Sequence, residues 1–151
     1  MTENRFGAVY ACAAGSEVAP SSRRILTERD FLRLEALLYS DRTLTLPVRR
    51  VLEEVLADAN VVPDAKVDAD IVTIGSMVHY KLGNLSAECR QIVLPGAYLH
   101  RGAYITLDTA LGVSLIGRRA PCRFEFRGGA TMACHLLELK FQPEHAVRNY
   151  G

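Results

Sequence analysis

The chain has 151 residues, of which 49% are apolar, so it can form one domain of ordinary size with its own hydrophobic core. Its 18 Lys and Arg residues nearly balance its 17 Asp and Glu residues, which leaves a formal net charge of +1. This balance excludes a protein that binds nucleic acid through a large basic excess. The sequence also lacks an apolar run of the length that a membrane-spanning helix needs, so we expect no membrane contact.

Residues 1–24 are predicted to form a flexible N-terminal arm, because they show neither helical nor strand periodicity and contain linker-like Gly, Pro and Ser residues. The apolar run Phe6–Ala14 is short, and Glu3 offsets Arg5, so we do not expect a secretory signal. The four cysteines have no CxxC or regular spacing, and we expect them to be reduced thiols of a cytoplasmic protein: Cys12, Cys89, Cys122 and Cys134.

Two amphipathic helices joined by a short loop are predicted after the arm. Structure is expected to begin at Ile25, with Thr27 as the N-cap of the first helix, whose apolar face extends to Leu38. The second is expected to begin at Pro47, and apolar residues then recur three and four apart up to Ala59. Residues 25–62 therefore predict a short antiparallel helical hairpin.

From Asp70 onward the apolar period changes to two, which is typical of β-strands. Gly75-Ser76 is expected to interrupt the first strand, and Gly128-Gly129 to form a tight turn between the last two. One face of the last strand is expected to carry Leu137, Leu139 and Phe141. The five predicted strands cover residues 71–80, 88–94, 103–107, 122–127 and 131–141.

The stretch Thr106–Arg118 predicts a short helix that crosses the sheet. Asp108 or Thr109 can cap its first turn, and Gly117 suits its C-terminal end. Residues 68–145 are therefore expected to form a small α+β domain with an antiparallel sheet and one crossing helix. Leucines recur four apart and form one apolar stripe, and the residues expected in the core include Leu107, Leu111, Leu115 and Ile116.

Four segments together resemble the regulator of nucleoside diphosphate kinase family, which is related to the bacterial Gre transcript-cleavage factors. They follow the family's order and spacing over about residues 25–145, and they are Ile25–Thr27, Asp70–Val78, Ala110–Gly117 and Leu137–Glu144. The resemblance implies an FKBP-like fold for the C-terminal half and a shortened coiled coil before it. It also implies docking of that half on the rim of the RNA polymerase secondary channel, with the hairpin pointing into the channel.

The contacts with polymerase that the resemblance implies fall at the hairpin tip and around the crossing helix. The candidates are Asp41, Thr109, Ala110, Gly112, Val113, Ser114, Arg118 and Arg119. The two arginines form a basic cluster with Arg123 and Arg127. This cluster is either the solvated face of a strand or a contact for an acidic partner surface.

Catalysis is not expected. In Gre factors two carboxylates at the coiled-coil tip help to hold a catalytic Mg²⁺, which requires close oxygen ligation. The predicted tip offers only Asp41, because Glu35 lies nearly two helical turns below it. We therefore expect no stimulation of transcript cleavage, no cofactor and no metal. Cys134 and His135 are neighbours in a predicted strand, so their side chains point to opposite faces and do not form a metal site.

Two alternatives remain open. The pairs Thr109-Ala110 and Pro121-Cys122 depart from the family's usual residues, which favours an interaction module with a partner other than polymerase. An FKBP-like fold also invites prolyl isomerisation, with aromatic residues as a possible pocket lining: Tyr80, Tyr104, Phe124, Phe126 and Phe141. Aromatics at period two in strands are more often core residues, and fold analogy alone does not establish an activity. The exposed face of the hairpin could pair between copies, so the oligomeric state stays open.

Overall fold

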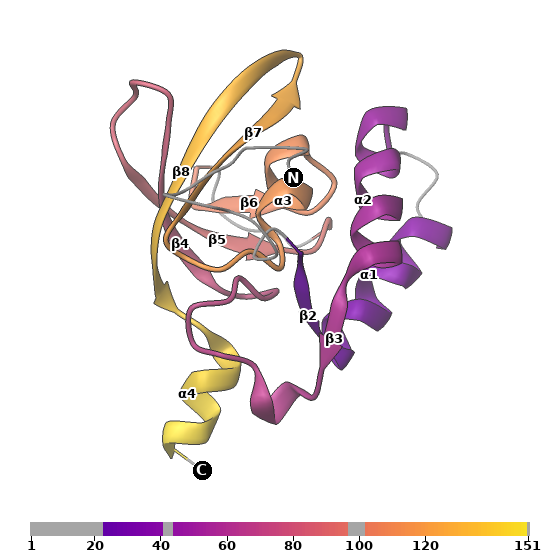
Figure 1. The fold of residues 1–151 in the computed structure, drawn as a ribbon, viewed down its shortest axis with the longest axis vertical. Coiled ribbons are helices and arrows are strands. Elements are labelled where there is room, and N and C mark those ends of the chain that lie inside the picture. Colours follow the sequence, from indigo (N-terminus) through magenta and orange to yellow (C-terminus); the bar gives the residue numbers. More distant parts are fainter. Residues whose placement is uncertain (1–22, 41–43, 97–101, 151) are drawn as a thin grey trace, which may run out of the picture.

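The structure is a computed structural model that describes residues 23–40, 44–96 and 102–150 (Figure 1). A curled five-stranded sheet lies on one side of the molecule and two packed helices lie on the other, with a short helix between them. The strand order in the sheet is β6-β5-β4-β8-β7. Its strands are β4 (Met77–Leu82), β5 (Glu88–Val93), β6 (Tyr104–Thr106), β7 (Cys122–Gly128) and β8 (Ala130–Phe141).

The two predicted amphipathic helices are present as α1 (Glu28–Ser40) and α2 (Leu46–Asp58), which pack against each other. Thr27 caps α1 as expected, because the backbone N–H of Asp30 donates to its Oγ1 across 3.0 Å. The predicted apolar faces are buried, through Leu34 and Leu38 on α1 and through Val48, Leu52 and Val55 on α2. The connection includes residues 41–43, which lie outside the described residues, so an antiparallel hairpin stays a prediction.

A small parallel sheet lies at the base of the two helices and was not predicted. It pairs β2 (Ile25–Thr27), which precedes α1, with β3 (Asn60–Val62), which follows α2. Structure therefore begins at Ile25 as predicted, but the three residues before the helix form a strand, because pairing with β3 holds them extended. A single 3₁₀ turn, η3 (Asp64–Lys66), continues the chain toward the main sheet.

The segment 71–76 is not a regular strand, which corrects the prediction of a strand from residue 71. Ile71 forms one isolated bridge with Arg119, and the backbone of Val72 exchanges hydrogen bonds with the segment at residues 117–118. The chain then turns at Gly75, which has a φ of +97°. The apolar side chains at 71–74 are buried. The apolar pattern therefore indicated buried residues correctly, but the backbone there is not the strand that it predicted.

The sequence predicted a purely antiparallel sheet, but the observed sheet is mixed. β6 pairs with β5 in parallel, whereas β4–β5, β4–β8 and β7–β8 are antiparallel. The predicted tight turn between β7 and β8 is confirmed by the pairing of Gly128 with Ala130. The three residues predicted to share one face of β8 differ in burial: Leu139 packs against the core, whereas Leu137 and Phe141 are 40% and 46% exposed. The β4–β8 register shifts twice along this part of the strand.

The crossing helix is α3 (Ala110–Leu115), which is shorter than the predicted stretch and contacts α2, β6 and β7. Thr109 is its N-cap, and Gly117 has the positive φ, +80°, that was expected beyond its end. The described C-terminal segment forms a helix, α4 (Pro143–Tyr150), that was not predicted. Gln142 fixes its start by donating from Nε2 to the carbonyl oxygens of Asp68 and Ile71.

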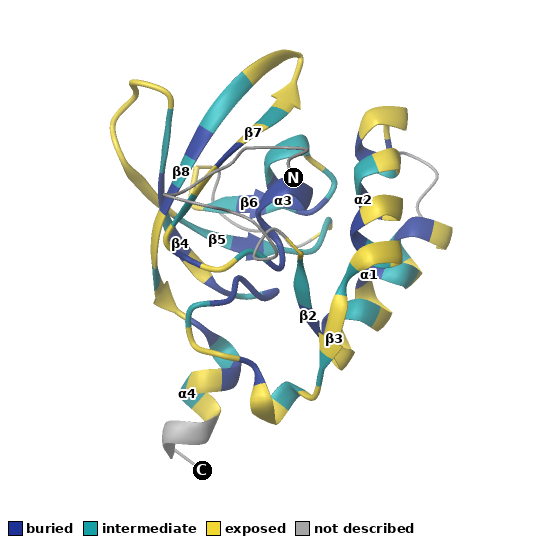
Figure 2. Ribbon diagram, viewed as in Figure 1, coloured by how far each residue is buried: buried dark blue, intermediate teal, exposed yellow. Residues whose placement is uncertain are grey.

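A single hydrophobic cluster includes side chains from α1, α2, α3 and the main sheet, and Figure 2 shows these buried positions facing one another. Leu115, Ile116 and Leu107 are completely buried in it, and Leu111 packs against it, as predicted. The domain boundaries proposed from the sequence, 25–62 and 68–145, therefore enclose parts that share one core. In the described ranges, no helix has the length and apolar character needed to cross a bilayer.

Candidate functional site

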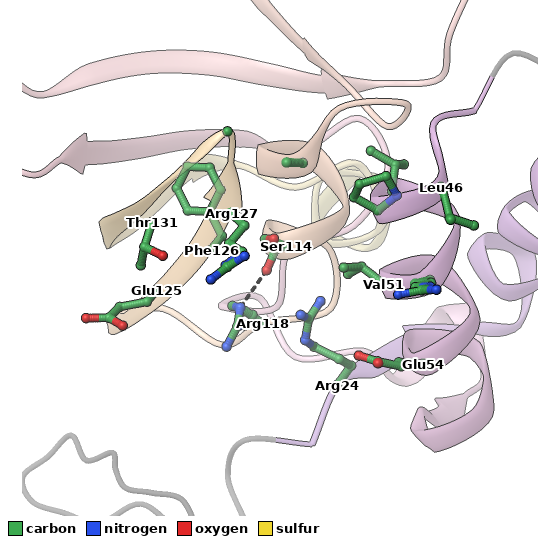
Figure 3. Close-up of a pocket in the computed structure, with 15 residues that line it drawn as sticks. Arg24, Leu46, Val51, Glu54, Ser114, Arg118, Glu125, Phe126, Arg127 and Thr131 are labelled. Carbon is green, nitrogen blue, oxygen red and sulfur yellow. Dashed lines mark hydrogen bonds between the residues drawn. The ribbon is translucent and has the colours of Figure 1, made fainter.

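A cleft of about 810 Å³ lies between α2 on one side and α3, β7 and β8 on the other (Figure 3). Four arginines and two glutamates line it, together with small and apolar residues. The lining residues come from distant parts of the sequence, and they are Arg24, Leu46, Pro47, Val48, Arg50, Val51, Glu54, Ala110, Ser114, Arg118, Glu125, Phe126, Arg127, Gly129 and Thr131. The cleft is therefore formed by the way the helix pair packs on the sheet, and its lining is net positive.

Arg24 enters the cleft from the residue before β2. Its Nη1 donates to the carbonyl oxygens of Val113 and Ile116, at 3.0 and 2.8 Å. These carbonyls belong to the last turn of α3, where helix geometry leaves carbonyl oxygens without intrahelical partners. Burial lowers the pKa of Arg24 well below its usual value, and the neighbouring charge of Arg118 lowers it further.

Arg118 enters from the loop after α3. Its Nε donates to the carbonyl oxygen of Ser114 at 2.5 Å, and its Cζ lies 3.8 Å from the centroid of the Phe124 ring. The guanidinium is thus held by a carbonyl at one edge and by an aromatic face below it. Burial lowers the pKa of Arg118 as well. Figure 3 shows Arg24, Arg118 and Arg127 directed toward the same opening.

The predicted contact residues around α3 do not form one exposed surface. Thr109 is exposed and uses its Oγ1 to accept from the backbone N–H of Gly112 at 3.2 Å. Ala110 and Ser114 line the cleft. Gly112 and Val113 are buried, so their side-chain positions face the interior and not a partner. The short helix turns this face toward the interior, and a role of the two residues in partner contact stays a prediction.

The basic cluster predicted from Arg118, Arg119, Arg123 and Arg127 is also divided by the fold. Arg118 and Arg127 line the cleft, whereas the other two do not. Arg119 forms ion pairs with Asp68 and Asp70 at 3.0 and 2.7 Å. Asp41, the remaining candidate, lies outside the described residues.

Two residues with strong structural roles were missed from the sequence. Arg24 fell in the segment interpreted as an arm, and Asp30 fell in the first turn of the first predicted helix. Asp30 is 1% exposed, and its Oδ2 accepts from the backbone N–H of Ile74 at 2.9 Å. A signal for Arg24 was its place directly before the apolar Ile25-Leu26 pair, but nothing in the sequence indicated the carbonyls that it binds.

The described part of the chain holds no group of three or more His, Cys, Asp or Glu side chains placed to bind a metal ion. The five aromatic residues considered for an isomerase pocket do not line the cleft together, although the rings of Phe124 and Phe126 lie 6.3 Å apart. Only Phe126 lines the cleft, while Tyr80 and Phe124 are buried in the core and Phe141 is largely exposed.

Comparison with known proteins gives the same family that the sequence resembles. No family model matches the chain. It is 26% identical over 125 residues to the regulators of nucleoside diphosphate kinase of Escherichia coli (strain K12) and Shigella flexneri, covering 81% of this chain and 92% of each relative. A prokaryotic transcription elongation factor GreA/GreB from Nitrosomonas europaea is 27% identical, with a TM-score of 0.64 over 79% of this chain and 98% of that one.

These relatives are named as regulators and elongation factors, not as catalysts. The curated relatives are thus named for nucleoside diphosphate kinase, and the solved structure for transcription elongation. The resemblance indicated by the sequence is confirmed: the chain is similar to the regulators of nucleoside diphosphate kinase, and it has a GreA/GreB-like fold.

Proposed function

We propose that the protein is a non-enzymatic transcription regulator that binds RNA polymerase near the secondary channel and competes there with Gre-type factors without stimulating transcript cleavage. The observation that carries the proposal is a GreA/GreB-like body joined to two helices of only 13 residues each. At 1.5 Å per residue such helices extend about 20 Å, which is short for a channel-penetrating coiled coil. The sequence similarity to regulators of nucleoside diphosphate kinase supports the same proposal.

The proposal includes an arrangement of parts. In it, residues 25–62 serve as a short helical hairpin and residues 68–145 as an FKBP-like body. The body grips the rim of the channel and the hairpin points into it. The protein acts in the cytoplasm, where its partner works.

The proposed contacts are those that the fold leaves accessible. Thr109 and Arg119 present exposed side chains, and Ala110 and Ser114 line the cleft beside them. Gly112 and Val113 support this surface from inside. Arg118 lines the cleft, and Asp41, which lies between the two helices in the sequence, stays a predicted contact.

A competition assay with stalled elongation complexes tests the proposal. Purified protein is titrated onto complexes that contain core RNA polymerase, with and without a Gre cleavage factor, and RNA length is read on a gel. We expect retention of the protein on immobilised polymerase and a dose-dependent loss of Gre-stimulated cleavage. RNA shortening by the protein alone would contradict the non-cleaving role, and passage over immobilised polymerase without retardation would contradict binding.

A second candidate is an interaction module whose partner is not polymerase. The cleft favours it, because a deep, net-positive cleft is a recognition surface for any acidic partner. The same immobilised-polymerase experiment separates the two candidates. Prolyl isomerisation has no comparable support, since the aromatic side chains do not share a pocket, and a peptide isomerisation assay is expected to show no activity above the uncatalysed rate.

A further inference from the structure

Arg24 and Arg118 both line the cleft and both donate to carbonyl oxygens at the C-terminal end of α3, yet neither has a carboxylate partner among the described residues. Arg24 is held by two carbonyl oxygens, and Arg118 by one carbonyl oxygen and the ring of Phe124. Among the acidic lining residues, Glu54 raises the pKa of Arg24, but this effect is smaller than the lowering caused by Arg118. The fold thus holds two like charges together in a partly desolvated place.

Such an arrangement favours an anion. Burial and mutual repulsion both destabilise the charged guanidinium groups, and a negative group placed between them would offset both effects. Their fixed hydrogen bonds use Nη1 of Arg24 and Nε of Arg118, which leaves the other guanidinium N–H groups as donors. Because the carbonyls and the aromatic ring already position both side chains, an anion would bind with little further ordering cost.

A phosphate group matches this pair better than a carboxylate does. Two adjacent cations are balanced by a group of charge close to −2, which a phosphate monoester carries near neutral pH and a carboxylate does not. The planar guanidinium fork also fits two phosphate oxygens at once. Arg50 and Arg127 at the sides of the cleft add positive charge, whereas Glu54 and Glu125 oppose an anion that approaches from their direction.

The remainder of the cleft indicates an organic part to the ligand. Its walls include Val51 and Leu46 from the α2 side and Ala110 and Phe126 from the sheet side. The volume of about 810 Å³ falls within the roughly 300–1,000 Å³ that small-molecule sites occupy. We infer that the cleft binds a small phosphorylated organic molecule, with its phosphate on Arg24 and Arg118 and its apolar part against these walls.

This inference does not depend on the proposed role at polymerase. A ligand in the cleft would touch α2 on one side and α3 on the other, so it would stabilise the packing of the helix pair on the sheet. Binding should therefore raise the unfolding temperature of the full chain in proportion to ligand occupancy.

Titration calorimetry of the full-length protein with phenyl phosphate tests the inference, with phenol, benzoate and inorganic phosphate as comparison probes. We expect saturable one-site binding of phenyl phosphate, weaker binding of inorganic phosphate and benzoate, and none of phenol. Arg118→Lys keeps the charge but removes the fork, and we expect it to weaken binding by about tenfold, as loss of a charged hydrogen bond does.

A matched pair on one strand provides the control for general charge effects. Arg123 and Arg127 are both exposed on β7, but only Arg127 lines the cleft. Arg127→Gln is expected to weaken phenyl phosphate binding by about twofold to fivefold, and Arg123→Gln to leave it unchanged. Because neither side chain is buried, both variants should fold, so the comparison holds even if an Arg118 variant does not.

Three outcomes would overturn the inference. Absence of saturable phenyl phosphate binding would show that the site does not exist. Equal losses of affinity in Arg123→Gln and Arg127→Gln would show that the binding is nonspecific charge attraction. Tighter binding of a hexaglutamate peptide than of phenyl phosphate would assign the cleft to an acidic protein segment instead. If the protein binds phenyl phosphate but is not retained by polymerase, the phosphate site stands and only the proposed function fails.

Discussion

The carboxylate of Asp30 accepts a hydrogen bond from the backbone N–H of Ile74 across 2.9 Å, which joins the first turn of α1 to the loop before β4. Its second oxygen, Oδ1, is buried and has no partner among the described residues. Thr73, next to Ile74, donates from Oγ1 to Glu144 of α4 at 2.7 Å. Three parts of the fold thus meet at one buried polar junction with two carboxyl groups.

The Asp30 junction makes stability depend on pH. Burial raises the pKa of Asp30 to about 6 from 3.8, and the charge of Glu144 adds to the increase. Between these values the folded state keeps a proton that the unfolded state has lost, so the free energy of unfolding falls as pH rises. Asp30→Asn should therefore reduce the change in the free energy of unfolding across this pH window by roughly 2–3 kcal/mol.

Urea unfolding of the wild-type protein and the variant near the two ends of that pH window measures the effect. Glu28→Gln is the matched control, because Glu28 is in the same helical turn and is exposed. It should leave the pH dependence as in the wild type. A wild-type slope that survives in Asp30→Asn would show that another group is responsible.

Gly112 is required by packing and not by a partner. A Cβ at this position would lie 2.2 Å from the backbone oxygen of Thr106. Gly112→Ala should therefore destabilise the protein by about 1–3 kcal/mol through overpacking. At Gly128 a Cβ would meet its nearest atom at an ordinary 3.5 Å, so Gly128→Ala is the control in a denaturant titration. Equal stability of the two variants would refute this account of α3.

Arg118 and Arg119 are adjacent in sequence and should respond differently to substitution. The ion pairs of Arg119 with Asp68 and Asp70 are exposed, so Arg119→Gln should change the free energy of unfolding by less than about 1 kcal/mol. Arg118→Gln loses the contacts with Ser114 and Phe124 and should cost more. Thermal unfolding compares the stability of the two variants. Arg119→Glu alone then tests polymerase binding at low salt without disturbing the cleft. A larger stability loss at Arg119 would reverse this assignment.

The thiols should differ in reactivity. Cys134 is completely buried, and burial raises its pKa to about 12, so almost no reactive thiolate forms near neutral pH. Cys89 is exposed. Iodoacetamide treatment of the folded protein, followed by peptide mass spectrometry, should label Cys89 and spare Cys134 until denaturant is added. Rapid labelling of Cys134 without denaturant would indicate that β8 opens in the native state.

The elements that sequence reasoning recovered are those whose side-chain pattern is long enough to define a period. The faces of α1 and α2, and the alternation of β7 around Phe124, were correct for this reason. β2 and β3 have only three residues each and are extended by pairing with each other, which no local pattern reports. The exposure of Leu137 depends on a register shift against another strand, so its own sequence could not show it.

The candidate site was less predictable than the fold. Thr109 and Gly117 were identified because capping chemistry acts within a few residues. The cleft instead combines residues from Arg24 to Thr131, so its composition depends on how α2 lies against α3. Whether Arg118 is a surface charge or a held guanidinium likewise depends on Phe124, which the fold places beneath it.

The side-by-side pairing of β2 with β3 places both ends of the helical excursion at one anchor, with Ile25 opposite Asn60 and Thr27 opposite Val62. Each added helical turn would extend the far end by about 5.4 Å while leaving that anchor in register. A protein with this architecture can therefore change the length of its helix pair by insertions and deletions between residues 27 and 60 while the pairing of β2 with β3 is kept.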